Sequence, residues 1–283
     1  MSSTTSSTGT SLLLQTRDSS GNLHDLKHPF QQIPRPFSRD PVTSGRVLWV
    51  ENFRSTSMSM MNDGAGQAFR DTDVTFFGNP VARLDTAGIA SSALNPGLSP
   101  DPTSGIVFKH RIQNDQQSGG VFGLDFWFAG GSANLTVGNI FSCHLYNRDG
   151  ATWHGGNLWF DFTIGGFPAK TRVLYSQTGP TYVPLTPDSN FSANGHTCDP
   201  SITNPLDRAL EWNNAKLVVD FTNNVYVSAR MNNIDFTSQI KGKTLPSTPD
   251  TSPTSAHGGV WFASQNTTRR YLHVAYFVFT DES

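Results

Sequence analysis

Two short segments place an indole and a carboxylate at alternate positions. One alternates Asp125 and Trp127 with leucine and phenylalanine, and the second alternates Trp159 and Asp161 with the same apolar types. Successive side chains of a strand point to opposite faces of its sheet. Each segment therefore predicts a strand with one apolar face and one face that offers a flat ring beside a carboxylate. Such a face suits the stacking and hydrogen bonding of a sugar.

Two other pairs of side chains resemble nucleophile or metal sites but lack the required geometry. Cys143 and His144 are adjacent on a predicted strand, so their side chains point to opposite faces. His24 and His28 lie four residues apart in a proline-rich stretch without a recognisable set of further ligands. We therefore predict no catalytic residues and no catalytic metal.

Two oxygen-rich turns could bind a calcium ion. Asp71 and Asp73 are separated by one residue, and residues 62–64 read Asn-Asp-Gly, which are side chains that bind calcium in loops. Neither stretch matches an EF-hand loop, and a solvated turn is the simpler interpretation. No GxGxxG or P-loop spacing occurs. We expect no cofactor, with a structural calcium as the alternative that stays open.

The clearest signal for regular structure surrounds the turn at residues 222–224. Apolar residues alternate with polar or smaller ones before this turn, and the alternation resumes after it. Alternation on both sides of a short Asn-rich turn predicts a β-hairpin. We expect the side with Val225 and Val227 to face the core, and the side with Tyr226 and Arg230 to be exposed.

The composition favours strands joined by loops. Of the 283 residues, 25 are glycine and 17 are proline, and aromatic residues make up 11%. About a dozen strands are predicted, which suits an all-β fold of two antiparallel sheets packed as a sandwich. Residues 154–156, His-Gly-Gly, are interpreted as a loop. The predicted core between the sheets contains Phe126, Phe128, Phe160, Phe162, Val219 and Phe221.

Residues 1–45 differ in composition from the rest of the chain. They are rich in serine, threonine and proline, and such a segment cannot bury enough apolar surface to fold alone. We predict an extended arm over residues 1–45 and a single β-sandwich domain over residues 46–283. The arm is either a disordered tail or a segment held by neighbouring subunits, and both interpretations stay open.

The order of the strands is familiar. A first strand ends in Glu51-Asn52-Phe53, a late strand WNNAKLVVDF precedes NVYVSARMNNIDF, and a final strand reads VAYFVFT. Over about residues 45–281 the chain resembles the concanavalin A-like or laminin G-like jelly-roll superfamily. The resemblance implies that the first and last strands pair and that a concave sheet binds glycans in many members. Fold alone does not decide function.

The resemblance also provides a comparison for enzymatic activity. Retaining glucanases of this fold carry two glutamates and an aspartate at alternate positions of one strand, with the reacting carboxylates about 5 Å apart. This sequence has no Glu-x-Asp-x-Glu spacing, and Asp125 and Asp161 lie on separate predicted strands. We therefore expect a protein that is not an enzyme. The predicted glycan-binding residues are Asp125, Trp127, Trp159, Asp161, Tyr226 and Arg230.

The charge balance argues against a general nucleic-acid binder. Charged residues make up 15% of the chain and the formal net charge is −2, whereas such binders carry a basic excess. No apolar run approaches the roughly 20 residues of a membrane helix, and no signal peptide is evident. We expect synthesis in the cytoplasm, with Cys143 and Cys198 as free thiols, although their pairing is left open.

The low charge and the abundance of Ser, Thr, Asn and Gly are typical of an extracellular protein. A phage or virus structural protein reconciles this composition with cytoplasmic synthesis, because lysis releases it. We expect an oligomeric component of a virion-like assembly, of the decoration or tail-fibre type. Its predicted partners are other subunits, contacted through the arm, with a glycan as a second partner. The alternatives are a stand-alone carbohydrate-binding protein and a glycan-active hydrolase or lyase.

Overall fold

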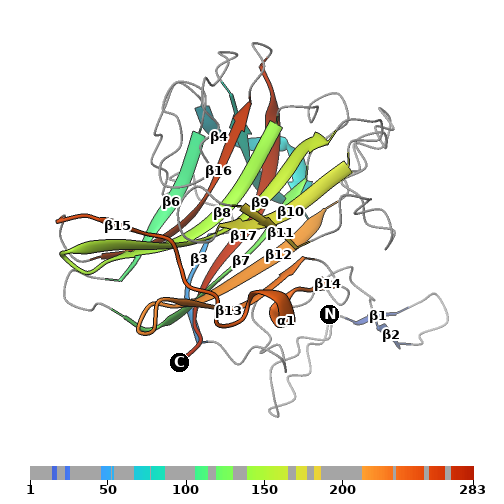
Figure 1. Ribbon diagram of the computed structural model, residues 1–283. Helices are drawn as coiled ribbons and strands as arrows, with labels where there is room; N and C mark the ends of the chain where they lie inside the picture. The colour runs from blue at the N-terminus through green and yellow to red at the C-terminus, as the bar shows by residue number, and fades with distance from the viewer. Residues whose placement is uncertain are drawn as a thin grey trace. The chain divides into compact units, whose positions relative to one another are not determined.

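The computed structural model describes most of the sandwich and two short strands that precede it (Figure 1). The chain divides into two units, Met1–Asp40 and Pro41–Ser283. In the first unit, β1 (Gln15–Arg17) and β2 (Leu23–Asp25) pair antiparallel. The described residues are 15–17, 23–25, 46–51, 53, 67–76, 78–86, 106–113, 119–129, 139–164, 170–176, 182–185, 212–231, 234–251, 255–264 and 269–283.

One sheet of the second unit has seven strands in the order β11-β10-β9-β8-β16-β6, and β15 pairs with the start of β9. All of its strand pairs are antiparallel. The strands are β6 (Ile106–Gln113), β8 (Asn139–Arg148), β9 (Thr152–Ile164), β10 (Lys170–Ser176), β11 (Tyr182–Pro184), β15 (Ser247–Pro249) and β16 (Ser255–Ser264).

The other sheet has eight strands in the order β14-β13-β12-β7-β17-β5-β4, and β3 also pairs with β17. Its pairs are antiparallel as well. The strands are β3 (Arg46–Glu51), β4 (Gln67–Phe76), β5 (Asn79–Asp85), β7 (Val121–Ala129), β12 (Asn213–Asp220), β13 (Val225–Met231), β14 (Ile234–Asp235) and β17 (Tyr271–Asp281).

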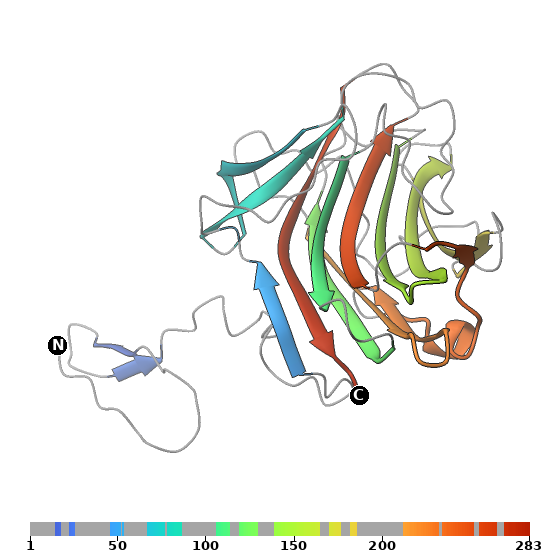
Figure 2. The same ribbon diagram turned by 90° about the vertical axis from the view of Figure 1, so that its left-hand side faces the viewer.

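The two sheets face each other as layers of a sandwich (Figure 1, Figure 2). The predicted all-β fold of two antiparallel sheets is therefore confirmed. Within the described residues the helical content is a single turn, α1 (Thr237–Ile240), and no described helix is long and apolar enough to cross a membrane.

The first and last strands of the sandwich pair, as the jelly-roll resemblance implied. β3 aligns antiparallel with the second half of β17, with Trp49 opposite Phe279 and Glu51 opposite Phe277. The first half of β17 pairs with β5 on the same side, so two shorter strands share one margin of a long one. Figure 2 shows β3 in blue beside β17 in red, with β4 and β5 in cyan above it.

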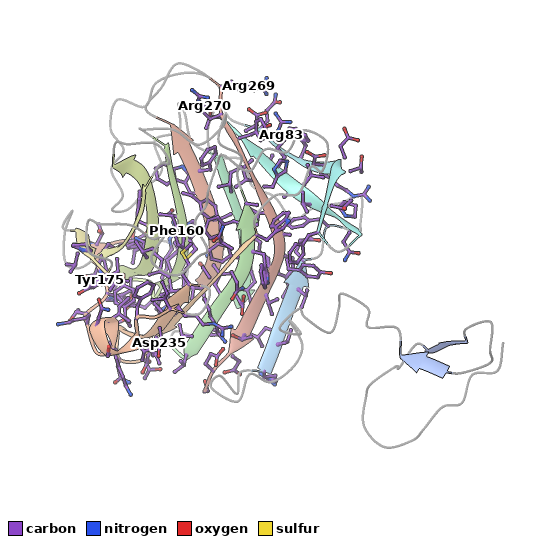
Figure 3. All side chains as sticks on the ribbon, turned by 90° about the vertical axis from the view of Figure 1, so that its right-hand side faces the viewer. Arg83, Phe160, Tyr175, Asp235, Arg269 and Arg270 are labelled. Carbon is purple, nitrogen blue, oxygen red and sulfur yellow. The ribbon has the colours of Figure 1, made fainter. Side chains whose placement is uncertain are left out.

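Phenylalanine rings fill the space between the sheets. Phe126 and Phe128 of β7 meet Phe160 of β9, with ring centroids 6.3 and 4.9 Å from the Phe160 centroid. All three are fully buried, and Phe160 lies in the interior of the sandwich in Figure 3. Val219 and Phe221 belong to the same core cluster, so five of the six predicted core residues are confirmed. The side chain of Phe162 lies outside the described residues.

The predicted hairpin forms, and Ala229 and Met231 face the core as expected, but a β-bulge reverses the facing of residues 225–227. Val218 is opposite Ser228 and Val219 is opposite Tyr226, so Val227 has no partner on β12. An extra residue changes which side chains face inward, because alternation has a period of two. Tyr226 is consequently buried, while Val225 and Val227 stay half-exposed. The expected facing of these residues was wrong.

The stretch at residues 154–156, expected to be a loop, lies inside β9. A Cβ atom on Gly155 would come within 2.2 Å of the Trp153 ring, and one on Gly156 within 2.5 Å of Val219. The two glycines therefore let one ring and one core side chain lie against the strand on its opposite faces. Their role here is close packing, which glycine allows because it lacks a Cβ atom.

Candidate functional site

The predicted site residues lie in both sheets and do not form a common groove. Asp125 and Trp127 belong to β7 of the eight-stranded sheet, whereas Trp159 and Asp161 belong to β9 of the seven-stranded sheet. The phenylalanine sides of these strands face each other across the core, so the opposite sides point away from each other. Packed sheets lie about 10 Å apart, and the two groups are separated by that layer. The side chain of Asp161 lies outside the described residues.

Asp125 and Arg230 do meet, on the outer face of the eight-stranded sheet. Arg230 Nη2 lies 3.3 Å from Asp125 Oδ2, and Asn214 Nδ2 donates to Asp125 Oδ1 at 2.6 Å. Burial raises the pKa of Asp125 above its usual value, while the charge of Arg230 and the Asn214 hydrogen bond act in the opposite direction. This carboxylate is held by neighbours of its own sheet.

A second ion pair lies on the same face. Lys216 Nζ is 2.7 Å from Glu282 Oε1, and the two side chains are only 7% and 8% exposed. The Thr280 hydroxyl donates to the same carboxylate oxygen. A Cβ atom on Gly123 would lie 2.3 Å from Thr280 Oγ1 and 2.8 Å from Glu282 Oε1, so this position accommodates only glycine without a shift. The contacts fasten the end of β17 to β12.

Trp127 belongs to a small apolar cluster outside the main core. Its ring centroid lies 5.2 Å from that of Phe76 at the end of β4, and Phe76 also meets Trp212 at 4.8 Å and Tyr276 at 5.5 Å. Asn79 Nδ2 donates to the Tyr276 hydroxyl at 2.5 Å. Trp127 is half-buried and packs against other side chains of its own chain.

Tyr226 is a core residue and cannot contact a ligand at the surface. Its hydroxyl donates to the Ser176 carbonyl at 2.7 Å and accepts from the Asn157 backbone N–H at 3.1 Å. The side chain is fully buried, and burial raises the pKa of Tyr226 above its usual range. The expected exposure was wrong because the bulge at Val227 turns this ring toward the core.

The outer side of the seven-stranded sheet carries a row of rings, which we term the aromatic face. The Trp159 and Trp261 rings meet edge to face at 5.4 Å, and Tyr146 stacks on His257 at 5.0 Å. Trp153 lies 5.8 Å from Tyr146. Strands β8, β9 and β16 are neighbours, which brings these rings together. The aromatic face consists of His144, Tyr146, Trp153, Trp159, His257 and Trp261.

Only part of the aromatic face is accessible. Trp159 and Trp261 are each 3% exposed, whereas His144, Trp153 and His257 are half-exposed around Tyr146. The Arg148 guanidinium lies 5.9 Å from the Tyr146 ring and is held by Asp250 at 2.8 Å. Flat rings beside nitrogen donors can stack on a sugar and bind its hydroxyl groups.

Sequence reasoning identified only Trp159 among these rings. Tyr146 and Trp261 occur in segments that alternate regularly with core residues such as Leu145 and Phe262. That alternation was a usable signal, because it places rings on the side opposite the core. Alternation could not show that β8 and β16 are neighbours in the sheet, because these strands are far apart in the chain.

The oxygen-rich turn at Asp71 is a hydrogen-bonded turn. Asp71 Oδ2 lies 3.0 Å from His273 Nε2, and Oδ1 accepts from the backbone N–H groups of Asp73 and Val74 at 2.9 and 3.2 Å. These contacts, with the His273 hydrogen bond first, lower the pKa of Asp71 to about 2. Both oxygens thus face donors, unlike the ligands of a cation. Residues 62–64 lie outside the described part.

No metal-binding group of three or more His, Cys, Asp or Glu side chains occurs among the described residues. Cys143 is a free, buried thiol, and burial raises its pKa to about 12. The thiol is therefore protonated at neutral pH and packs as a small core residue. Cys198 lies outside the described residues.

No protein-family model matches this sequence, and no curated protein sequence does. Solved structures are similar at low identity. A carbohydrate esterase from the Shiga toxin-encoding bacteriophage phi24B is 13% identical, with 84% of this chain and 100% of that chain covered and a TM-score of 0.45. Lectin I from Ulex europaeus, in complex with the methyl glycoside of α-L-fucose, is 12% identical over 82% and 97%, with a TM-score of 0.40.

Alginate lyase vAL-1 from Chlorella virus is 10% identical, with 78% of this chain and 90% of that chain covered and a TM-score of 0.40. These likenesses concern the fold. In this chain itself, the feature that agrees with the resemblance stated from the sequence is the pairing of β3 with β17, the first and last strands of the sandwich.

Proposed function

We propose that this chain is a structural or surface component of a virion-like assembly and not an enzyme. Its lectin-like sandwich is the folded body, and residues 1–45 are an arm that contacts other subunits. The observation that carries the proposal is that carboxylates of the sandwich are held in ion pairs with basic side chains of the same sheet. Asp125 is held by Arg230, and Glu282 is held by Lys216, each within its own sheet.

Glycan hydrolysis by paired carboxylates requires two such groups on either side of one bond, about 5 to 10 Å apart. Asp125 and the strand position of Asp161 belong to different sheets whose outer sides face in opposite directions. Asp85 is 3% exposed and is paired with two arginines. These arrangements stabilise the sandwich and support a role that does not involve bond cleavage.

The division of the chain into two units supports the proposal that its N-terminal segment is an arm. Residues Met1–Asp40 form a unit of their own, in which β1 and β2 pair with each other, and the sandwich begins after it. Segments rich in Ser, Thr and Pro can gain order when they bind a neighbour. Such a segment suits attachment between subunits.

Removal of residues 1–44 tests this proposal. The truncated chain is expected to keep the far-ultraviolet circular dichroism of a β-sandwich, because the core cluster contains no residue before Trp49 among those described. Sedimentation velocity is expected to show smaller species than the full chain forms at the same concentration. A truncated chain that sediments in the same oligomeric state as the full chain would contradict the proposal that the arm contacts other subunits.

A second candidate function, carbohydrate binding by a stand-alone protein, is favoured by the aromatic face. Half-exposed Trp153 beside Tyr146 is the best-placed stacking ring among those described. If a glycan array identifies a ligand, Trp153→Ala is expected to weaken its binding about tenfold. Trp49→Ala, which removes a half-buried indole from the other sheet, is the matched control. Equal affinity of the Trp153→Ala variant and the wild type would exclude the aromatic face as the glycan-binding site.

A glycan-active hydrolase or lyase is the third function. Incubation of the full chain with a panel of neutral and acidic polysaccharides is expected to release no reducing ends and no unsaturated products. Turnover that disappears in Asp125→Asn would overturn the proposal that the chain is not an enzyme.

A further inference from the structure

One end of the outer face of β4, β5 and β17 gathers arginines and exposed rings. Phe69 is opposite Arg83, and Asp85 is opposite both Gln67 and Tyr271, so these side chains share one side of the sheet. Arg83 and Arg269 lie at the same end of the sandwich in Figure 3. We term this group the arginine patch: Gln67, Phe69, Arg83, Asp85, Arg269 and Tyr271.

Arg83 is held in one orientation by rings. Its guanidinium carbon lies 3.8 Å from the Tyr271 ring centroid and 5.3 Å from that of Phe69. Arg83 Nη2 donates to Asp85 Oδ2 at 3.0 Å, and the side chain is still 28% exposed. A guanidinium fixed by stacking loses little further entropy when it binds an oxyanion in its plane.

Arg269 adds a second positive charge to the same carboxylate. Its Nε donates to Asp85 Oδ1 at 2.6 Å, and its Nη2 donates to Gln67 Oε1 at 3.3 Å. The Arg269 side chain is 57% exposed, whereas Asp85 beneath it is 3% exposed. Two guanidinium groups thus share one buried carboxylate, and the patch carries an excess positive charge at its surface.

Asp71 lies on the same side of the sheet, one pair further along β4, where it contacts His273 and not the two arginines. By contrast, Arg46 at the other end of the sheet has Asp281 as its own partner at 3.0 Å. Two guanidinium groups that share a single carboxylate, one of them stacked against rings, can together recognise an anionic group.

The rings narrow the class of ligand. Phe69 is 38% exposed and is one of three large apolar side chains exposed in the described part of the chain. It lies beside the guanidinium of Arg83, so a ligand that reaches the charge also meets an apolar ring. We propose that the arginine patch binds an acidic saccharide, with Arg83 and Arg269 on its carboxylate or sulfate and Phe69 against the sugar ring.

An acidic peptide fits the patch less well. Extended peptides are commonly bound through backbone hydrogen bonds at a sheet edge. Gln67 and Phe69 belong to β4, the edge strand of this sheet, whereas Arg83 lies on β5, which pairs with strands on both sides. The charged groups of the patch therefore lie on the sheet face and not along its edge. The patch is also on the sheet opposite the aromatic face, so this inference does not depend on the proposed function.

Calorimetry with the full chain at low ionic strength tests the proposal. The probes are heparin oligosaccharides, which carry sulfate, oligogalacturonate, which carries carboxylate, and dextran, which is neutral. Saturable binding of an acidic probe is expected, together with no binding of dextran. Arg269→Gln is expected to weaken binding about tenfold, and Phe69→Ala several-fold. Which acidic probe binds more tightly distinguishes a sulfate ligand from a carboxylate ligand.

Arg46→Gln is the matched control, because it removes an exposed arginine from the same sheet at its other end. Its affinity is expected to equal that of the wild type. Absence of binding by both acidic probes would overturn the proposal, and so would an equal loss in Arg46→Gln and Arg269→Gln, which indicates unspecific charge attraction. Tighter binding of polyglutamate than of either saccharide would indicate that the patch binds an acidic protein, and it would overturn the proposal of an acidic saccharide ligand. Thermal melts of each variant show whether the fold is retained.

Discussion

At the scale of the residue, the contact between Asp71 and His273 links stability to pH. The hydrogen bond from His273 and two backbone N–H groups hold the pKa of Asp71 at about 2, below its usual value. A depressed folded-state pKa stabilises the protein above the unfolded value and loses this effect as the pH falls toward the folded value. Stability from Asp71 is thus present above about pH 4 and is lost on the way to about pH 2.

We expect this contribution to be about 1–2 kcal/mol. Urea unfolding at several pH values should show the free energy of unfolding falling more steeply from about pH 4 to about pH 2 in the wild type than in Asp71→Asn. Parallel pH profiles of the two proteins would contradict the assignment.

Phe160 tests the packing of the core at the same scale. It is fully buried and touches rings from β7 and β8, including Phe128 at 4.9 Å and Phe141 at 5.7 Å. Phe160→Ala is expected to lower the free energy of unfolding by about 3–5 kcal/mol, because it leaves a cavity between the sheets. Phe69→Ala, at a ring that is 38% exposed, is the control and is expected to cost less than about 1 kcal/mol. Similar losses in both variants would contradict a core position for Phe160.

At the scale of the element, the ion pair between Lys216 and Glu282 fastens the end of β17 to β12. Removal of one partner leaves the other charge buried without compensation, so Lys216→Met is expected to cost about 3–5 kcal/mol. Replacement of both, in Lys216→Met/Glu282→Leu, is expected to recover most of this loss. Chemical denaturation of the three proteins measures the difference. A double variant that is less stable than Lys216→Met would contradict the expectation.

The facing of side chains within each strand was predictable from alternation wherever the strand is regular. Phe126 and Phe160 were placed in the core correctly, because alternation separates the two faces of each strand. Alternation says nothing about which sheet a strand joins, so it could not show that Trp127 and Trp159 lie in different sheets. At Tyr226, one extra residue in the hairpin inverted the pattern, and no local signal marks that bulge.

At the scale of the whole molecule, the two sheets share one core and should unfold together. Phe126 of one sheet and Phe141 of the other lie 5.7 Å apart, and neither sheet can keep its apolar face covered alone. Thermal unfolding followed by near-ultraviolet circular dichroism and by tryptophan fluorescence is expected to give coincident transitions. The chain without residues 1–44 is expected to have the same midpoint. Separated transitions would show that the sheets are independent.

The position of β17 has a consequence for how the protein is made. This strand joins β7 on one side to β5 and β3 on the other, and it comes last in chain order among the described strands. Until it leaves the ribosome, the strands on its two sides have nothing to connect them, and core phenylalanines stay exposed. Ribosome-bound chains that stop before Tyr271 should therefore recruit holding chaperones, whereas chains extended beyond Asp281 should release them. Folding of the eight-stranded sheet would then be completed only when β17 is free to pair.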